Sequence, residues 1–155
     1  MTFTVHESAA PREAVGPDMS GRDESSTVAI CRTCPRDQPR SGEQGLALYH
    51  EIRDRLTSLG VTVMMVHCLG SCRTPCAVAL DAPTKPRVRL SGLKDADAAD
   101  LIDAVLEYRE AAPGEVTAAV LPEPLQHHVT AISPKPKRIT TPPSFHQPVS
   151  FRRNT

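Results

Sequence analysis

The sequence predicts a mixed α/β domain in which one sheet is packed against two main helices. Two short runs rich in β-branched residues, 27–31 and 61–67, flank a segment whose apolar residues recur at helical spacing. Two further alternating segments follow, separated by a turn-rich connection, and a second amphipathic segment comes last. These observations give the element order β-α-β-β-β-α, between two termini that lack a periodic pattern.

The first strand is expected at residues 27–31, because the run TVAIC stops at a polar turn that contains two cysteines. Ser41 can cap the helix that follows, and Gly60 ends the apolar stripe of that helix. The second strand, residues 61–67, is a continuous run of Met and β-branched residues. Such a run is typical of a central strand that is buried on both faces.

Residues 76–81 and 87–92 alternate in polarity and are expected to form an antiparallel hairpin joined through DAPTKP. The last helix has Asp95 in its first-turn region and stops at Pro113. A right-handed crossover makes the first two strands parallel, so the predicted order corresponds to a thioredoxin-like arrangement. In that arrangement, the loops that follow the first two strands meet at one end of the sheet.

Composition divides the chain into three parts. Residues 1–26 mix Pro, Gly, Ser and acidic groups, and are expected to be a disordered leader. Residues 27–121 form the predicted thioredoxin-like domain that binds a metal or cluster. Residues 122–155 are rich in Pro and basic side chains, and are expected to be an extended or disordered tail. The leader is acidic and the tail is basic.

Overall charge and targeting signals exclude several classes of function. The 155 residues include 18 basic and 18 acidic side chains, a balance that gives no support for binding to nucleic acid or to a membrane surface. Apolar runs such as 63–66 are far shorter than the roughly 20 residues of a membrane span. No signal core is visible near the N-terminus, so a cytoplasmic location is expected. Thiols stay reduced there, and five cysteines therefore favour metal or redox chemistry over structural disulfides.

The cysteine spacing is the most informative motif. Cys31 and Cys34 form a C-x2-C pair, Cys68 and Cys72 form a C-x3-C pair, and Cys76 follows. Four thiolates from two loops at strand ends, with backbone amides nearby, are what a 2Fe-2S cluster needs. The first four cysteines are therefore the predicted cluster ligands. Cys76 is kept as a fifth candidate metal ligand, although the apolar run that it begins favours a packing role.

Two alternatives to a cluster remain open. Zinc also accepts four thiolates, but zinc pairs are usually tight C-x2-C knuckles, and the C-x3-C pair favours the wider two-iron centre. Cys31 and Cys34 also resemble the cysteine pair of a thiol-disulfide oxidoreductase, because they follow a strand in a βαβ context. That interpretation leaves three cysteines unexplained. It also lacks a helix that starts directly at the pair, because Pro35, Pro39 and Gly42 intervene.

The chain resembles domain-of-unknown-function family 1636 over about residues 27–134. The resemblance is carried by VAICRTC, GLALYHEIRDRL, CLGSCRTPCAVALDAP, LSGL and DADAADLIDAVLEY, and it matches the five cysteines one for one. It implies a metal-binding protein similar to thioredoxin-like 2Fe-2S ferredoxins, including the peripheral 2Fe-2S subunit of respiratory NADH dehydrogenase. It also implies a link to cobalamin biosynthesis and cobalt handling, because genes of the family often lie beside genes for those processes.

Residues around the cysteines suggest further roles. Arg32 and Arg73 lie inside the two cysteine loops and would give an anionic cluster a positive rim. His67 is expected to tune the site rather than to bind iron, and the pair His127 and His128 is expected to be solvated.

The sequence shows no catalytic triad, phosphate-binding glycine loop or paired carboxylates. We therefore expect an electron carrier or a metal-binding accessory protein rather than an enzyme. Its partner would be a redox protein or a cobalamin-pathway enzyme. The oligomeric state is open, with a homodimer as one option.

Overall fold

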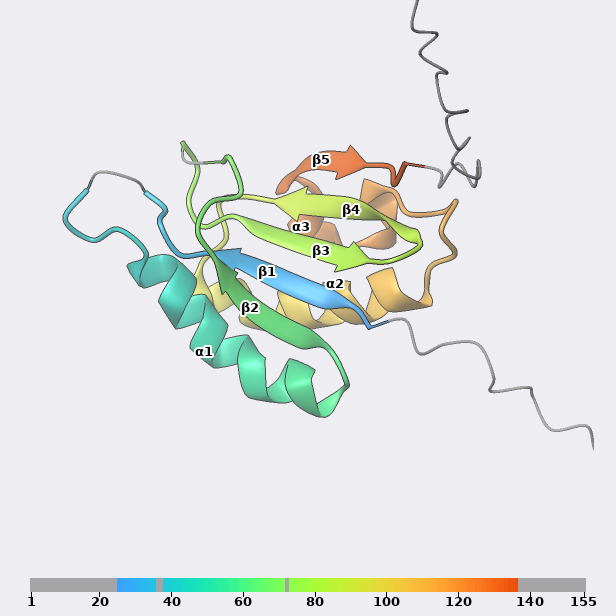
Figure 1. The fold of residues 1–155 in the computed structure, drawn as a ribbon, viewed down its shortest axis with the longest axis horizontal. Coiled ribbons are helices and arrows are strands. Elements are labelled where there is room, and N and C mark those ends of the chain that lie inside the picture. The colour runs from blue at the N-terminus through green and yellow to red at the C-terminus, as the bar shows by residue number, and fades with distance from the viewer. Residues whose placement is uncertain (1–24, 36–37, 72, 137–155) are drawn as a thin grey trace, which may run out of the picture.

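A computed structural model describes residues 25–35, 38–71 and 73–136, and Figure 1 shows its arrangement. The described part contains five strands and three α-helices, joined by loops and two short 3-10 turns. In chain order these are β1 (Thr27–Cys31), α1 (Glu43–Ser58), β2 (Thr62–Val66), β3 (Val78–Ala82), β4 (Lys85–Leu90), α2 (Ala98–Glu110), α3 (Glu123–Gln126) and β5 (Val129–Ser133). None of these helices is long and apolar enough to cross a membrane.

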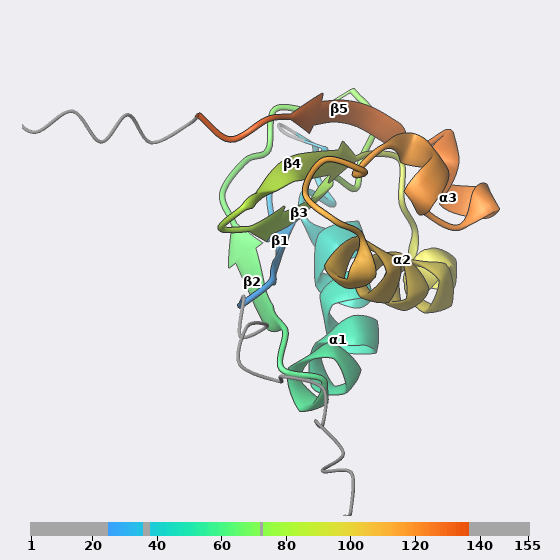
Figure 2. The same ribbon diagram turned by 90° about the vertical axis from the view of Figure 1, so that its right-hand side faces the viewer.

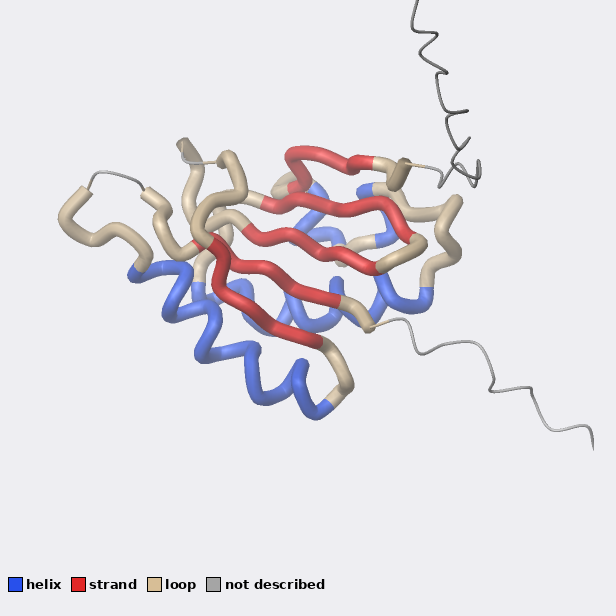
Figure 3. The backbone as a smooth tube through the Cα atoms, viewed as in Figure 1, coloured by secondary structure: helices blue, strands red, loops and turns tan. Residues whose placement is uncertain are grey.

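The strands form one sheet in the order β2-β1-β3-β4-β5. β1 and β2 are parallel and are connected through α1, whereas β3, β4 and β5 each pair antiparallel with their neighbour (Figure 1). Figure 3 shows the strands of this sheet side by side in red. A parallel crossover unit followed by an antiparallel hairpin and a helix is the predicted thioredoxin-like arrangement. The predicted fold class is therefore confirmed, with β5 added at one edge.

Within residues 25–35, 38–71 and 73–136, the helices cover one face of the sheet, and no helix lies on the other face (Figure 2). Alternate residues of each strand point toward the helices, and these form the main core together with the apolar stripes of α1 and α2. Strand residues of this core include Val28, Ile30, Val78, Leu80, Val88 and Leu90, and helix residues include Leu48, Ile52, Leu56, Leu101 and Val105. The opposite set of strand residues faces away from the helices. We call their side the helix-free face.

Three elements differ from the sequence-based expectation. β2 lies at an edge of the sheet rather than at its centre, and Met64 is 42% exposed there. The apolar composition of β2 indicates burial on both faces, but no helix in the described part of the chain covers its second face. α1 begins after Gly42, at φ 85°, instead of at a Ser41 cap, because the Ser41 hydroxyl donates to the carbonyl of Thr33.

The third difference lies beyond the expected domain end at Leu121. Residues 122–136 contain α3 and β5, and Leu121 and Leu125 belong to the main core. Ile132 of β5 is packed against that core, and Val88 is its partner in β4. Most of the expected leader, residues 1–24, and the tail from residue 137 onward lie outside the described residues.

Candidate metal centre

Both cysteine loops begin at the same end of the sheet, because β1 and β2 are parallel. Cys31 is the last residue of β1 and is paired with Val66, the last residue of β2. Cys68 follows two positions later on the neighbouring loop. The crossover connection therefore brings two distant sequence segments to one place, as the predicted order of strands and helices implied.

Strand alternation places Cys31 on the helix-free face. Its neighbour Ile30 points into the main core, whereas Cys31 belongs to a second, smaller apolar cluster with Cys34 and Ala77. Leu69 of the second loop is packed against this cluster. Cys31 and Cys34 have no exposed surface, so the pair sits in a water-poor environment that strengthens electrostatic interactions.

The Sγ atoms of Cys31 and Cys34 are 3.2 Å apart. A disulfide bond would be about 2.05 Å long. Two thiolates on one tetrahedral metal, each about 2.3 Å from it, would be about 3.8 Å apart. The two sulfur atoms thus need to separate by only a few tenths of an ångström to hold a metal ion between them.

Hydrogen bonds tie the first cysteine loop to the second. The Thr33 hydroxyl donates to the carbonyl of His67, and Cys31 Sγ lies 3.8 Å from the same carbonyl oxygen and 3.7 Å from Thr33 Oγ1. Within the first loop, the Ser41 hydroxyl donates to the Thr33 carbonyl at 2.9 Å. Thr33 therefore connects the β1 loop, the β2 loop and the segment that precedes α1.

The Cys31 thiol is tuned toward its thiolate form. Burial opposes ionisation, but hydrogen bonds from the Thr33 backbone, the Cys34 and Thr33 side chains and the Leu69 backbone outweigh it and lower the pKa of Cys31 below 9.0. The thiolate is the form that binds metals and attacks disulfides. The contribution of Leu69 is notable, because it comes from the loop that carries Cys68.

The second loop supplies Cys68, which is half-buried, and its Sγ accepts a hydrogen bond from the backbone N–H of Gly70 at 3.3 Å. Amide donors to sulfur are typical of cluster sites, where they disperse negative charge. The predicted ligand Cys72 lies outside the described residues. Among the residues that the structure describes, no three potential metal ligands are gathered closely enough to hold an ion.

Cys76 lies apart from the pair and belongs to the main core on the helix side of the sheet. Burial, reinforced by the nearby Cys31, raises the pKa of Cys76 to about 12. Its Sγ lies 3.5 Å from the Ala77 carbonyl oxygen. A neutral, buried thiol with these neighbours suits the packing role expected from the sequence.

The other singled-out residues are distributed as follows. Arg32 and Arg73 are exposed, as a positive rim requires. The His67 side chain is also exposed, and the His67 carbonyl oxygen accepts a hydrogen bond from Cys31 Sγ. His128 is not simply solvated, because its Nδ1 lies 2.7 Å from the Ser91 carbonyl oxygen and its ring lies against that of His127.

Sequence reasoning did not identify Thr33 or Leu69 as parts of the site. The position of Thr33 inside C-x2-C was a usable signal, because a hydroxyl there lies next to both thiols. Leu69 carried no such signal, since its contact with the cysteine pair depends on how the two loops pack.

The arrangement can bind a soft metal ion or undergo thiol redox chemistry. A solved structure that is similar to this chain is a thioredoxin-like [2Fe-2S] ferredoxin from Aquifex aeolicus, with 15% sequence identity and a TM-score of 0.48. The alignment covers 73% of this chain and 96% of that one. No curated protein matches the chain. The family of proteins of unknown function DUF1636 matches residues 28–135, and the chain belongs to this family.

Proposed function

We propose that the protein holds one 2Fe-2S cluster through Cys31, Cys34, Cys68 and Cys72 and carries single electrons. The observation that supports the proposal most strongly is the Cys31–Cys34 pair, with sulfur atoms 3.2 Å apart, in contact with the loop that bears Cys68. Four thiolates delivered by two loops match the ligand requirement of such a cluster. When bound, the cluster supplies reversible one-electron transfer.

The chain itself would perform three tasks around the cluster. Burial of Cys31 and Cys34, with Leu69 packed against them, would keep water from these two sulfur atoms. Backbone amides of the second loop, such as that of Gly70, donate to sulfur and stabilise negative charge. Arg32 and Arg73 present exposed positive charge on the same two loops.

These charges define the partner that we propose. An exposed cationic rim around an anionic cluster favours encounter with an acidic surface, which raises the association rate and suits transient electron transfer. We infer that the partner is an acidic redox protein. A cobalamin-pathway enzyme is a proposed identity for it, on the basis of the family resemblance alone.

A thiol-disulfide oxidoreductase is the second candidate, because the pKa of Cys31 is lowered and Cys34 Sγ lies 3.2 Å away. However, α1 begins only at Glu43, so the cysteine pair does not lie at a helix N-terminus, which would stabilise a thiolate. Cys34 is also completely buried. Structural or regulatory zinc is the third candidate, since the same sulfurs can surround it.

Metal analysis of the full chain separates these candidates. We expect protein purified anaerobically, after expression with ample iron and zinc, to be brown and to contain about two irons and two sulfides per chain. Stoichiometric zinc without sulfide would contradict the cluster and favour the zinc protein. Metal-free protein that forms a reversible Cys31–Cys34 disulfide would favour the oxidoreductase.

A further inference from the structure

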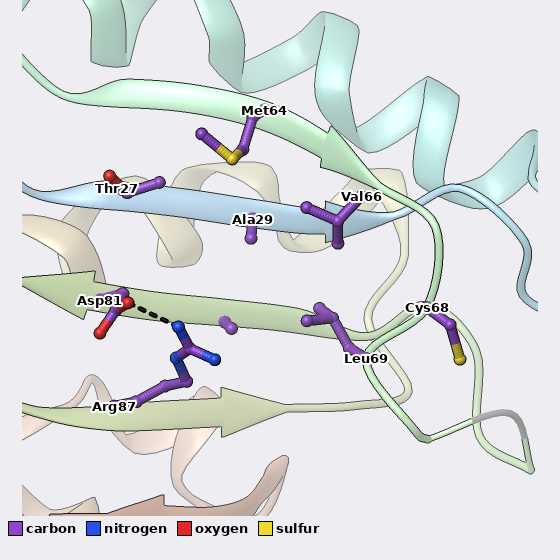
Figure 4. A pocket seen from close by; sticks show the side chains of 9 residues that line it. Thr27, Ala29, Met64, Val66, Cys68, Leu69, Asp81 and Arg87 are labelled. Carbon is purple, nitrogen blue, oxygen red and sulfur yellow. Dashed lines mark hydrogen bonds and ion pairs between the residues drawn. The ribbon is translucent and has the colours of Figure 1, made fainter. Parts of the chain in front are cut away.

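A groove of about 420 Å³ lies on the helix-free face, and Figure 4 shows the side chains that line it. Ala29, Met64, Val66 and Leu69 give the groove apolar walls. It runs from an Asp81–Arg87 ion pair at one end to the β2 loop with Cys68 at the other. One end of the groove therefore reaches the candidate metal centre.

The charged side chains around the groove are mostly cationic. Arg87 donates to Asp81 at 2.7 Å, and Lys135 binds the other oxygen of the same carboxylate. These contacts outweigh the effect of burial and lower the pKa of Asp81 below 3.8, so its single negative charge is compensated twice.

Arg89 adds a further positive charge to this face. It lies opposite Ala79, which lines the groove, and cross-strand partners point to the same side of a sheet. Among the described residues, Arg89 Nε is a buried donor without a hydrogen-bond partner. A carboxylate that hydrogen-bonds to this guanidinium group would satisfy the buried donor and so stabilise the folded state.

The N-terminal leader enters the fold at this groove. Thr27 is the first residue of β1, and its side chain also lines the groove beside Asp81 (Figure 4). The preceding residues 1–24 carry two basic side chains and five acidic ones, namely Glu7, Glu13, Asp18, Asp23 and Glu24. Phe3 and Met19 give the same segment apolar side chains.

We propose that residues 1–24 of the leader fold back across the helix-free face and occupy the groove. Its excess of carboxylates complements Arg87, Arg89 and Lys135, and its apolar residues match the walls of the groove. A fully extended chain of this length spans at most about 80 Å. That span exceeds the length of a five-residue strand, about 17 Å. Because the leader is tethered at the groove, its effective concentration there is in the millimolar range.

The C-terminal tail is the less suitable occupant. It leaves the described fold just after Lys135, also near Asp81, but residues 137–155 carry four basic side chains and no acidic one. These charges would be repelled by the arginines of the face. The inference does not depend on the cluster, because it uses only the groove, the charges and the attachment point of the leader.

Pulsed hydroxyl-radical footprinting of the full chain, read by mass spectrometry, tests the proposal. The informative residue is Met64, which is 42% exposed beside the groove, and the internal reference is its neighbour Met65, which is packed against the main core. One variant neutralises the leader through Glu7→Gln, Glu13→Gln, Asp18→Asn, Asp23→Asn and Glu24→Gln. The matched control neutralises the tail through Lys137→Gln, Arg138→Gln, Arg152→Gln and Arg153→Gln.

We expect the leader variant to increase modification of Met64 several-fold relative to Met65, and the tail variant to leave it unchanged. Raising the salt concentration to about 1 M shortens the Debye length to about 3 Å and should reproduce the increase in the wild-type chain. Equal modification of Met64 in the wild type and the leader variant would overturn the proposal. An increase in the tail variant, or an increase on dilution of the wild type, would also overturn it, because the occupant would then be the tail or a second copy.

Discussion

Strand alternation assigns different roles to cysteines that are close in the sequence. Cys31 points to the helix-free face and contacts Cys34, whereas Cys76 points into the main core beside α1. The pKa directions agree with this division, since Cys31 is tuned toward a thiolate and Cys76 toward a neutral thiol. Metal ligation requires the thiolate, so Cys76 is the cysteine that the cluster can do without.

Substitution of Cys76 tests this assignment. We expect Cys76→Ser to keep the visible spectrum and to lower the free energy of unfolding by about 1 to 2 kcal/mol, because a hydroxyl replaces a buried thiol but can donate to the Ala77 carbonyl. The matched substitution Cys34→Ser should bleach or strongly shift the spectrum. Visible absorption and denaturant unfolding measure the two effects.

The opposite pattern would identify a different ligand set. If Cys76→Ser removed the cluster and Cys34→Ser retained it, the ligands would be Cys31, Cys68, Cys72 and Cys76. The position of Cys34 beside Cys31 would then be a packing contact.

Thr33 is the residue whose side chain links the two cysteine loops. We expect Thr33→Val, which keeps the shape but removes the hydroxyl, to accelerate loss of the cluster to a chelator by about twofold to tenfold, the kinetic equivalent of one hydrogen bond. Thr33→Ser should retain the wild-type rate, because it keeps the donor. The decay of visible absorption measures the rate. Equal rates for all three proteins would show that the hydroxyl does not hold the loops together.

At the scale of the elements, a close approach between α1 and the end of β1 positions the site. A Cβ atom on Gly45 would lie 2.2 Å from the Cys31 carbonyl oxygen and 3.5 Å from Cys76 Sγ. The helix can therefore lie this close to the strand only because position 45 has no side chain.

Gly45→Ala should consequently destabilise the fold, although alanine favours helices. We expect a loss of about 1 to 3 kcal/mol in the free energy of unfolding, as is usual for overpacking against a backbone atom that cannot move away. The exposed neighbour Gln44 provides the control, because Gln44→Ala adds no contact and should be neutral. Unchanged stability in Gly45→Ala, measured by denaturant unfolding, would mean that α1 can shift without cost.

Local sequence patterns predicted most of the strands and helices, but not which elements lie next to them. Alternation and turn residues identified the strands of the hairpin, and the helical spacing identified α1 and α2. The edge position of β2 was missed, because an apolar run reports hydrophobicity and not which neighbour covers it. β5 was missed because five residues between Pro-rich stretches gain their stability from pairing with β4, a contact distant in sequence.

At the scale of the whole molecule, the topology explains why the cysteine spacing was informative. A right-handed crossover requires parallel strands, so the loops that carry Cys31 and Cys68 had to lie at one end of the sheet. The sequence could not predict the contact of Leu69, the lowered pKa of Cys31 or the groove beside Cys68, since each depends on packing between segments far apart in the chain.

The central claim is that Cys31, Cys34, Cys68 and Cys72 hold a one-electron centre. A reductive titration followed by visible absorption tests this claim most directly. The protein purified anaerobically as the full chain should bleach partially and reversibly on uptake of about one electron per chain, as a 2Fe-2S cluster does. A matched titration of Cys34→Ser should show no such change. Colourless wild-type protein, or uptake of two electrons without a change in visible absorption, would contradict the account.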